Sequence, residues 1–410
     1  MPNIRTLPRS LVAVLLLNIT LAVCYVAFFG KVAADGDLWR ADFTNFYTGW
    51  RMIREGHGAN LYDLDLQTRT QQRLLAGRSF ADGLLPFVNP PHSALPFVPL
   101  AWLSRTNAHL VWLLFNAGLL VYLVRRLLAL AHDWRTIERW LLITAVLALP
   151  PLYTTFLVGA FSLLVTVCLL NAYLALRAGN QRTAALWLFV GTVKFQLVLL
   201  PAVWLVGARR WRAVGWGVGL SAAAFVVVGW LWGWQIWGAY AAVLRLHSDS
   251  YDFMGIHPAA TYSFKGALSL ALGRSYAPQI NHIATLALGA AALASGWLGH
   301  RSRGADGAGI AWSFGLATLL GIVFNLHLYA HDVLTVLVPA TLFYLFLRER
   351  QRPRRAFTRW ILLAPLLFFG GDFIVQTSLG IQIPVVLLAV LLGWMAQERG
   401  FLPQITTDNR

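Results

Sequence analysis

Charged residues are scarce in this sequence. Asp, Glu, Lys and Arg make up 12% of the 410 residues, whereas soluble domains carry about 25%. Hydrophobic residues reach 58%, and the mean hydropathy is +0.60. Long apolar runs recur from end to end, and a helix needs about 20 apolar residues to cross a bilayer core of about 30 Å. The composition therefore predicts an all-α, polytopic membrane protein.

Cysteine is nearly absent as well. Cys24 and Cys168 both fall in apolar runs, and we interpret them as buried thiols that support neither a disulfide framework nor a metal cage. No soluble domain, internal repeat or low-complexity linker is evident. The first apolar run, residues 11–29, is long enough to span and lacks a clear small-residue cleavage site. We therefore expect one integral membrane domain over residues 1–410.

The positive charge that is present gathers in short loops. The formal net charge is +16, which in a soluble protein would suggest a nucleic-acid partner. Arginine in short loops instead marks the cytoplasmic side of a membrane protein, so we expect no nucleic-acid partner and cytoplasmic N- and C-termini. Twelve crossings place every short arginine-rich loop on that side. The expected spans lie near residues 11–29, 107–124, 140–155, 160–176 and 213–232, with others ending at "HRSRGAD", "NLHLYAHD" and "RERQRPRR" and two more following.

The stretch 184–206 does not fit a single crossing. It lies between Arg182 and the basic run "ARRWR", and one span would put one of these clusters outside. Two short helices that meet near Lys194 keep both inside, and non-helical backbone is tolerated at depth where protein or a wet cavity surrounds it. Lys194 itself is either a functional cation that binds a phosphate or a lysine that snorkels from a helix end.

A long first external loop, residues 30–106, contains helical patterns that are too short and too charged to span. Aromatic and aliphatic residues at positions 43, 46, 47, 50 and 53 predict an interfacial helix with Trp and Tyr at headgroup level. "GHGAN" ends this helix and "LDLQTRTQQRLLAG" predicts a second one. Pro90 and Pro91 forbid a continuous helix, so residues 92–103 are expected to form a third short element.

Asp42 stands at the start of the first of these interfacial helices. One interpretation is structural, because Asp is a favoured N-cap and suits the positive end of the helix dipole. The other is catalytic, with the carboxylate as a general base that takes a proton from an acceptor hydroxyl at the membrane surface. The two interpretations are compatible, since capping would hold the carboxylate still.

Histidines and further charges occur at two other external positions. His327 and His331 are four residues apart with Asp332 adjacent, a pattern that would suit phosphate or sugar binding, a polar interface or, with a third partner, a metal. The second external loop, residues 233–278, is expected to be mostly solvated, with one or two of its charged groups contacting a phosphate. Its candidates are Arg245, His247, Asp249, Asp252, His257, Lys265 and Arg274.

Several of these stretches together resemble a known family. The ordered set "DFTNFYTGWRMIREGHGANLYD", "VNPPHSALPFVPLAWL", "LVGAFSLLV", "VKFQLVLLPAVWL" and "NLHLYAHDVLTVLVPA" resembles the bacterial glycosyltransferase family 87. These are membrane enzymes of the GT-C type that use polyprenyl-phosphate mannose or related donors. The resemblance implies an inverting hexosyl transfer at the outer face of the bacterial inner membrane, onto a glycolipid or cell-envelope glycan. It implies no cofactor and leaves a divalent metal open.

The resemblance also implies roles for individual residues. Asp42 matches the catalytic base, Lys194 matches a lysine that Pro usually follows, where this chain has Phe195, and His327 matches a histidine five residues before an Asp. Gly159-Ala160 stands where the family usually has Gly-Gln. We expect the donor phosphate to contact Lys194, His327 and Arg245, and the substrates to contact Tyr47, His92, His331 and Asp332.

Two other classes of function compete with this one. A transporter or lipid flippase would also have about twelve helices and a buried lysine, but such carriers tend to show repeats and charges at the bilayer midplane. A lipid-linked glycan ligase or polymerase also works on polyprenyl carriers, and it would rely on arginines in a large external loop. Arg245 and Arg274 are the only arginines in the second loop here.

Overall fold

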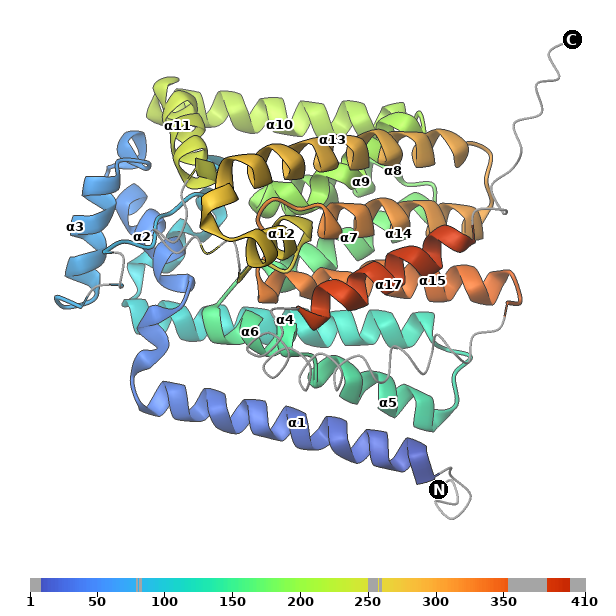
Figure 1. Cartoon of the computed structure of the whole chain (residues 1–410). Coiled ribbons are helices and arrows are strands. Elements are labelled where there is room, and N and C mark those ends of the chain that lie inside the picture. Colours follow the sequence, from blue (N-terminus) through green and yellow to red (C-terminus); the bar gives the residue numbers. More distant parts are fainter. Residues whose placement is uncertain are drawn as a thin grey trace, which may run out of the picture.

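The computed structural model describes residues 9–352 and 382–398, except residues 79, 81–82, 250–256 and 258–259. Every regular element within these ranges is helical, so the predicted all-α class is confirmed. The long helices lie side by side and run between two ends of the molecule (Figure 1). One end carries the small helices of the first loop, and the N-terminus lies at the other.

Six helical stretches within the described ranges are long and apolar enough to cross a membrane, or seven if one pair bent by 44° counts as a single span. The six are α1 (Arg9–Ala34), α4 (Arg105–Leu130), α8 with α9 (Gln181–Gly191 and Phe195–Gly207), α10 (Trp211–Trp232), α13 (Ala277–Arg301) and the stretch Ala330–Glu349, which contains α15 (Leu337–Glu349). The bent pair is α5 (Thr136–Leu147) and α6 (Pro150–Val158). Shorter apolar helices are α7 (Ser162–Arg177), α14 (Gly307–Val323) and α17 (Ile383–Gln397).

The chain is therefore a multi-pass membrane protein. Twelve crossings were predicted from the charge pattern, and the described residues supply the six or seven stretches that qualify by length and composition. The last two crossings were predicted to follow "RERQRPRR", and residues 353–381 of that part lie outside the described residues.

The first residue of α8 and the last residue of α9 lie at the same end of the molecule. Gln181, the first residue of α8, accepts a hydrogen bond from a backbone N–H in the first turn of α10 (3.3 Å). Gly207, the last residue of α9, comes only four residues before the first residue of α10. Both ends of the pair therefore lie beside the start of α10.

The connection between α8 and α9 lies at the opposite end of α10. There Trp232, the last residue of α10, packs against Gly58 of the first loop. Asn89 of the same loop donates a hydrogen bond to the carbonyl of Val193 (2.8 Å). Gln181–Gly207 is long and apolar enough for one crossing, but the chain runs to the loop end, turns at the 3₁₀ turn Thr192–Lys194 and runs back, as the basic flanks of this stretch indicated.

The predicted short elements of the first loop are present, but their environment differs from the prediction. They are α2 (Phe43–Arg54), α3 (Leu64–Leu74) and the 3₁₀ segment η4 (Pro91–Trp102). The expectation that aromatic residues of α2 face lipid headgroups is wrong for Tyr47 and Trp50, which are 1% and 0% exposed. The Trp50 ring packs against Phe97 of η4 and Trp112 of α4. These rings hold α2 to the bundle.

The second external segment is more ordered than a solvated loop. It contains α11 (Gln235–Asp249) and α12 (Phe264–Leu272). Ser263 caps α12 by accepting a hydrogen bond from the N–H of Gly266. The backbone N–H of Tyr262 donates to the carbonyl of Leu328 (2.7 Å) and ties this segment to the chain that follows α14. The expectation of a mostly solvated loop is therefore wrong for the start of α12.

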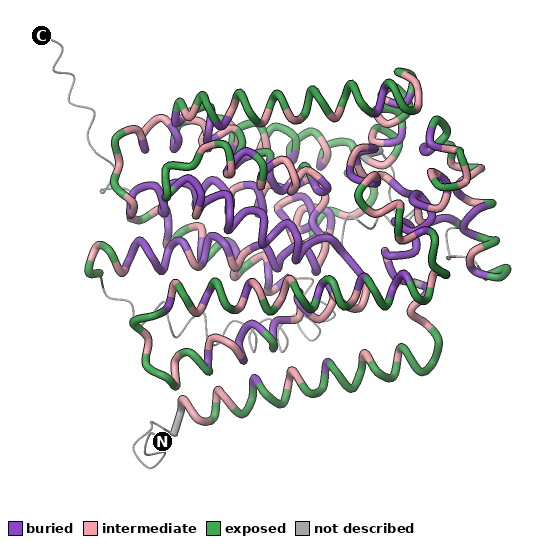
Figure 2. The backbone as a smooth tube through the Cα atoms, turned by 180° about the vertical axis from the view of Figure 1, so that it is seen from behind, coloured by how far each residue is buried: buried purple, intermediate pink, exposed green. Residues whose placement is uncertain are grey.

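Buried residues concentrate in α7, α14 and α15, which form the centre of the bundle (Figure 2). The helices α1 and α10 lie at its edges and are largely exposed (Figure 2), as expected of surfaces that face lipid. The helix α1 packs mainly along α5.

The helices α9 and α13 approach each other so closely that only glycine fits. A Cβ atom on Gly207 would lie 1.9 Å from the carbonyl oxygen of Gly296, and one on Gly299 would lie 2.2 Å from the carbonyl oxygen of Trp204. Small residues at helix interfaces allow such backbone contact, which drives helix association in membranes by van der Waals packing.

We predict that Gly299→Ala lowers the stability of the protein, because its methyl group must push the two backbones apart. Overpacking of this kind costs about 1–3 kcal/mol. Gly289→Ala on the same helix is the matched control, since its Cβ would meet nothing within 4 Å. Thermal unfolding in detergent should show a lower midpoint for Gly299→Ala only. Equal midpoints for the two variants would contradict the packing.

Candidate active site

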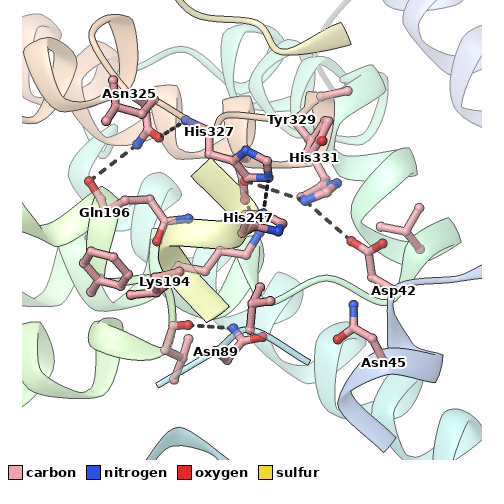
Figure 3. A pocket seen from close by; sticks show the side chains of 18 of the residues that line it. Asp42, Asn45, Asn89, Lys194, Gln196, His247, Asn325, His327, Tyr329 and His331 are labelled. Atoms are coloured by element: carbon pink, nitrogen blue, oxygen red, sulfur yellow. Dashed lines mark hydrogen bonds and ion pairs between the residues drawn. The ribbon is translucent and has the colours of Figure 1, made fainter. Parts of the chain in front are cut away.

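A cavity of about 640 Å³ lies at the loop end of the bundle. Its walls come from α2, the segment before η4, α6, the turn between α8 and α9, the first residues of α9, α11, α12, α13 and the segment between α14 and α15. Figure 3 shows polar side chains from these elements pointing into one space. The polar lining residues are Asp42, Asn45, Asn89, Thr154, Lys194, Gln196, His247, Tyr262, Lys265, Asn325, His327, Tyr329, His331 and Asp332.

Asp42 occupies the N-cap position of α2, but its side chain makes no capping hydrogen bond. Its Oδ2 instead lies 3.8 Å from Nε2 of His331, across the cavity (Figure 3). The next residue, Phe43, is fully buried and stacks on His109 of α4 with ring centroids 4.5 Å apart. The aromatic packing of α2 therefore fixes the backbone that carries Asp42.

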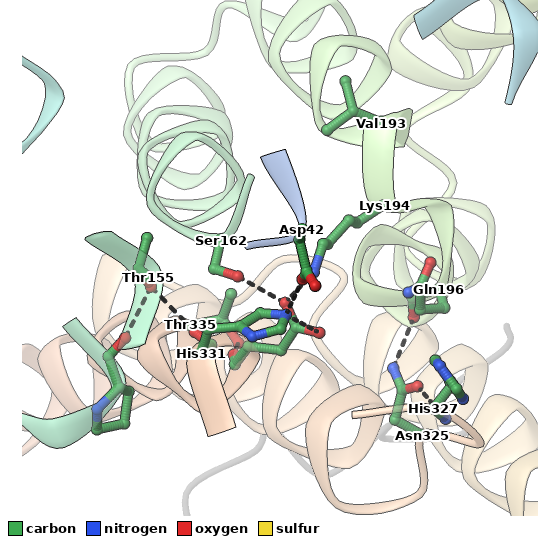
Figure 4. A network of polar contacts seen from close by, with 12 residues as sticks. Asp42, Thr155, Ser162, Val193, Lys194, Gln196, Asn325, His327, His331 and Thr335 are labelled. Atoms are coloured by element: carbon green, nitrogen blue, oxygen red, sulfur yellow. Dashed lines mark hydrogen bonds and ion pairs between the residues drawn. The ribbon is translucent and has the colours of Figure 1, made fainter. Parts of the chain in front are cut away.

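A buried ion pair joins the hairpin turn to the segment before α15. Nζ of Lys194 lies 2.5 Å from Oδ1 of Asp332, and the two side chains are 10% and 2% exposed. The Ser162 hydroxyl, at the start of α7, donates to the same oxygen (2.6 Å), as Figure 4 shows. Lys194 is thus neither a snorkelling lysine nor an isolated cation, because its charge is matched by a carboxylate.

His331 lies between two carboxylates. Its Nε2 is 3.8 Å from Oδ2 of Asp42 and 3.6 Å from Oδ2 of Asp332. A chain of contacts therefore runs from Ser162 and Lys194 through Asp332 and His331 to Asp42. This chain links the conformation of the Asp42 side chain to that of the buried ion pair.

His327 points to a different partner. Its Nε2 lies 3.1 Å from Nε2 of His247 on α11, and its backbone N–H donates to the side chain of Asn325 (2.8 Å). Burial lowers the pKa of His327 well below its ordinary value, and burial also lowers the pKa of His247 to about 4. Both rings are therefore neutral at pH 7, with one donating a hydrogen bond to the other.

The two histidines of "NLHLYAHD" thus diverge and do not form a common ligand set. No group of three or more His, Cys, Asp or Glu residues suited to a metal ion occurs in the part of the chain that the structure describes.

Burial also raises the pKa of the Asp42 carboxyl above its ordinary value, and the charges of His331 and Lys194 oppose part of that rise. A carboxylate with a raised pKa is a stronger base than an exposed one, and tuning of this kind is common for catalytic acids and bases. The group can therefore accept a proton within the cavity.

Two candidates of the second external loop, His247 and Lys265, line the cavity. Five of the eight residues that were predicted to act as the base or to contact the substrates also line it: Asp42, Lys194, His327, His331 and Asp332. The other three do not line it. Tyr47 is buried, and its hydroxyl donates to the carbonyl of Leu103 (2.6 Å). His92 lies 3.0 Å from the Thr192 hydroxyl, behind the hairpin turn, and Arg245 is exposed on α11.

Two residues that line the cavity, Asn45 of α2 and His247 of α11, could have been placed there from the helical period of the sequence. With about 100° per residue, Asn45 lies close to Asp42 around α2, whereas Tyr47 is rotated by about 140° from it. Asn45 is 8% exposed, and its Oδ1 has no hydrogen-bond partner. On α11, His247 faces the cavity while Arg245, about 200° away, faces outward.

Comparison with known proteins identifies one family. The sequence model of glycosyltransferase family 87 matches residues 87–324. That range includes Lys194 and Lys265, and it ends just before Asn325. No curated protein and no solved structure matches the chain.

We predict that Lys194→Met destabilises the protein by about 3–5 kcal/mol, because it leaves Asp332 charged, buried and without its ammonium partner. The double variant with Asp332→Asn removes both charges and should recover most of that loss, since paired removal of buried charges is often close to neutral. The measurement is the unfolding midpoint in detergent. If the double variant were no more stable than Lys194→Met, the pair would not be the cause.

Proposed function

Because the chain belongs to glycosyltransferase family 87, and is therefore a membrane glycosyltransferase, we propose that it transfers a hexose from a polyprenyl-phosphate sugar to a hydroxyl of a glycolipid or cell-envelope glycan. Mannose is the proposed sugar, from the resemblance to polyprenyl-phosphate-mannose enzymes. The observation that carries the proposal is the orientation of Asp42, whose carboxylate faces a cavity rather than capping its own helix.

The lining of the cavity supports a substrate with a polar head and an apolar tail. Beside the polar groups stand Phe195 and Leu199 of α9 and Leu288 of α13. Phe195 and Leu199 are 40% and 41% exposed, on the outer surface of a helix that belongs to the membrane bundle. A polyprenyl chain can lie along this apolar side while its sugar occupies the polar interior.

In the proposed reaction, an acceptor hydroxyl attacks the anomeric carbon from the face opposite the phosphate. The new C–O bond forms as the bond between the anomeric carbon and the phosphate oxygen breaks, and the electron pair of that bond stays on the phosphate. Asp42 takes the acceptor proton, and the configuration inverts. The unpartnered Oδ1 of Asn45 stands one turn along α2 and accepts a hydrogen bond from a sugar hydroxyl.

Lysine charge stabilises the departing phosphate in this proposal. Lys194 contributes its field, although its ammonium is shared with Asp332. His327 contributes as a neutral hydrogen-bonding group, because burial keeps its pKa low. Arg245, the arginine of the second loop that was predicted as a third phosphate contact, does not line the cavity.

The membrane orientation follows from the direction of the helices. The arginine-rich connections after α7, α9, α13 and α15 lie at the end opposite the cavity. By the positive-inside rule that end is cytoplasmic. We therefore propose twelve crossings of a bacterial inner membrane, with both termini in the cytoplasm and the cavity at the outer face, where α2, α3 and η4 lie near the membrane surface.

We predict that Asp42→Asn lowers the rate of hexose transfer by about 10²- to 10⁴-fold, the usual contribution of a general base, while donor binding persists. The control is Asp65→Asn on the exposed side of α3, which should transfer at the wild-type rate. Transfer from a polyprenyl-monophosphate sugar is the assay, with a diphosphate-linked sugar alongside to test a polymerase-type reaction. Wild-type turnover by Asp42→Asn would remove the base assignment.

We predict that activity falls on the acid side at a higher pH than an exposed aspartate would give. The base must be ionised to accept a proton, and its raised pKa keeps it protonated to a higher pH than the ordinary value of about 3.9. The measurement is kcat/KM for the acceptor against pH in the wild type. An acid limb centred at or below the ordinary value would show that a different group is titrating.

A further inference from the structure

The end of the bundle opposite the cavity carries two sets of arginines. Members of the first set are matched by acids, since Arg177 lies 2.7 Å from Glu349 and Arg350 lies 2.8 Å from Asp306. The second set gathers where α8 and α10 begin and where α9 and α13 end (Figure 1). We call this second set the arginine face, and its members are Arg182, Arg209, Arg210, Arg212 and Arg303.

The acids of the described residues leave the arginine face without a countercharge. Among the ion pairs of these residues, none includes a member of the face. Asp306 follows Arg303 by only three residues, but its carboxylate is held by Arg350 and by the N–H of Gly309 in α14. Grouped like charges repel one another, so the arginine face predicts an anionic partner from outside the chain.

Contacts between helices hold two of these arginines around one tryptophan. Gln181 accepts a hydrogen bond from the N–H of Ala213 (3.3 Å), which joins the start of α8 to the start of α10. The guanidinium of Arg182 lies over the ring of Trp216, 5.1 Å from its centroid. Arg212 is four residues before Trp216 in α10, and residues at this spacing are neighbours on a helix surface. Arg182 and Arg212 therefore flank the same ring.

Two further arginines are held together at the end of α9. Nε and Nη2 of Arg303 donate hydrogen bonds to the carbonyl oxygen of Gly207 (3.0 and 2.8 Å). Desolvation, together with the positive charge of Arg209, lowers the pKa of the Arg303 guanidinium. The hydrogen bonds thus hold Arg303 close enough to Arg209 for the two charges to repel each other.

Arg209 occupies a position that usually belongs to glycine. Its φ of 52° lies in the left-handed region, which is unfavourable for residues with a Cβ atom. The N–H groups of Arg209 and Arg210 donate to the carbonyls of Val206 and Leu205 (3.0 Å each), the hydrogen-bond pattern that closes a helix with glycine at this position. The helix α7 ends in the same pattern with Gly179. The chain therefore keeps a positive charge at Arg209 in spite of backbone strain.

Exposed tryptophan rings accompany the arginine face. Trp211 and Trp216 of α10 and Trp297 of α13 are all exposed, and the guanidinium of Arg301 lies over the ring of Trp297, 5.9 Å from its centroid. Tryptophan gathers at the headgroup level of bilayers because its ring is apolar and its N–H is polar. A soluble anionic partner would give no reason for these rings, so they favour a lipid.

We propose that the arginine face binds the phosphate headgroup of an anionic phospholipid, with phosphatidylglycerol as the type of lipid. Guanidinium groups donate pairs of hydrogen bonds to phosphate oxygens, and basic sites between membrane helices bind anionic headgroups. The lipid phosphate supplies the countercharge for α8, α9, α10 and α13. This site lies at the end opposite the cavity, and the inference does not depend on hexose transfer.

The test is native mass spectrometry of the purified full-length protein in detergent, titrated with phosphatidylglycerol. Phosphatidylcholine, inorganic phosphate and a short RNA oligonucleotide are parallel probes. Arg182→Gln and Arg212→Gln should each weaken phosphatidylglycerol binding about fivefold, the usual contribution of one basic side chain near an anionic surface, and leave phosphatidylcholine binding unchanged. Arg125→Gln removes an exposed arginine of α4. It is the control for net charge and should bind as the wild type does.

Two further variants separate the site from the fold and from net charge. Arg209→Gly should not lower the unfolding midpoint, because glycine adopts positive φ without strain, but it should weaken phosphatidylglycerol binding about fivefold. Trp216→Leu keeps the net charge and should also weaken binding, because it removes the ring that Arg182 lies over.

Three results would overturn the proposal. The first is equal affinity for phosphatidylglycerol in the wild type, Arg182→Gln, Arg212→Gln and Arg209→Gly. The second is an equal loss in Arg125→Gln, which would show attraction by net charge alone. The third is binding of inorganic phosphate or of RNA at least as tight as that of phosphatidylglycerol, with the same loss in the arginine variants. That result would identify a free phosphate or a nucleic acid as the partner in place of a lipid.

Discussion

The buried pair of Lys194 and Asp332 is the contact on which the arrangement of the site depends. It joins a helical hairpin to the segment between α14 and α15, two parts of the chain separated by 138 residues. Ser162 adds the start of α7 to the same oxygen. Charges buried in this way are costly unless each has a partner. The pair therefore restricts how these three elements can be placed, and His331 transmits that restriction to Asp42.

The second constraint is aromatic packing around α2. Phe43, Phe46 and Trp50 are at most 4% exposed, and their rings contact α4, η4 and Phe161 at the N-terminus of α7. A short helix with three charged residues at its end would not remain in place at a membrane surface by its own propensity. Its rings anchor it to the bundle, and Asp42 is aimed into the cavity because the helix cannot rotate.

The sequence predicted those features that depend on local pattern or on overall charge balance. Hydropathy and arginine position predicted the apolar helices and the hairpin around Lys194. Aromatic spacing with the positions of glycine and proline predicted the elements of the first loop, and an acid at the head of an aromatic helix marked Asp42. Tyr47 was grouped with Asp42 although the helical period separates them. Lys265 was predicted only as one of seven candidates in the second loop, because its burial depends on contact between Tyr262 and Leu328, 66 residues apart, which no local pattern indicates.

The glycine contacts between α9 and α13 have a consequence for how a lipid can reach the cavity. The two helices are joined from the hydrogen bond between Ser295 and the Leu200 carbonyl (2.6 Å) to the crossing at Gly207. Because α9 and α13 are held together over this length, they can separate only beyond it, toward the loop end of the bundle. Phe195 and Leu288, which line the cavity, lie beyond that length toward the loop end, so in the proposed function this is where an isoprenoid tail enters.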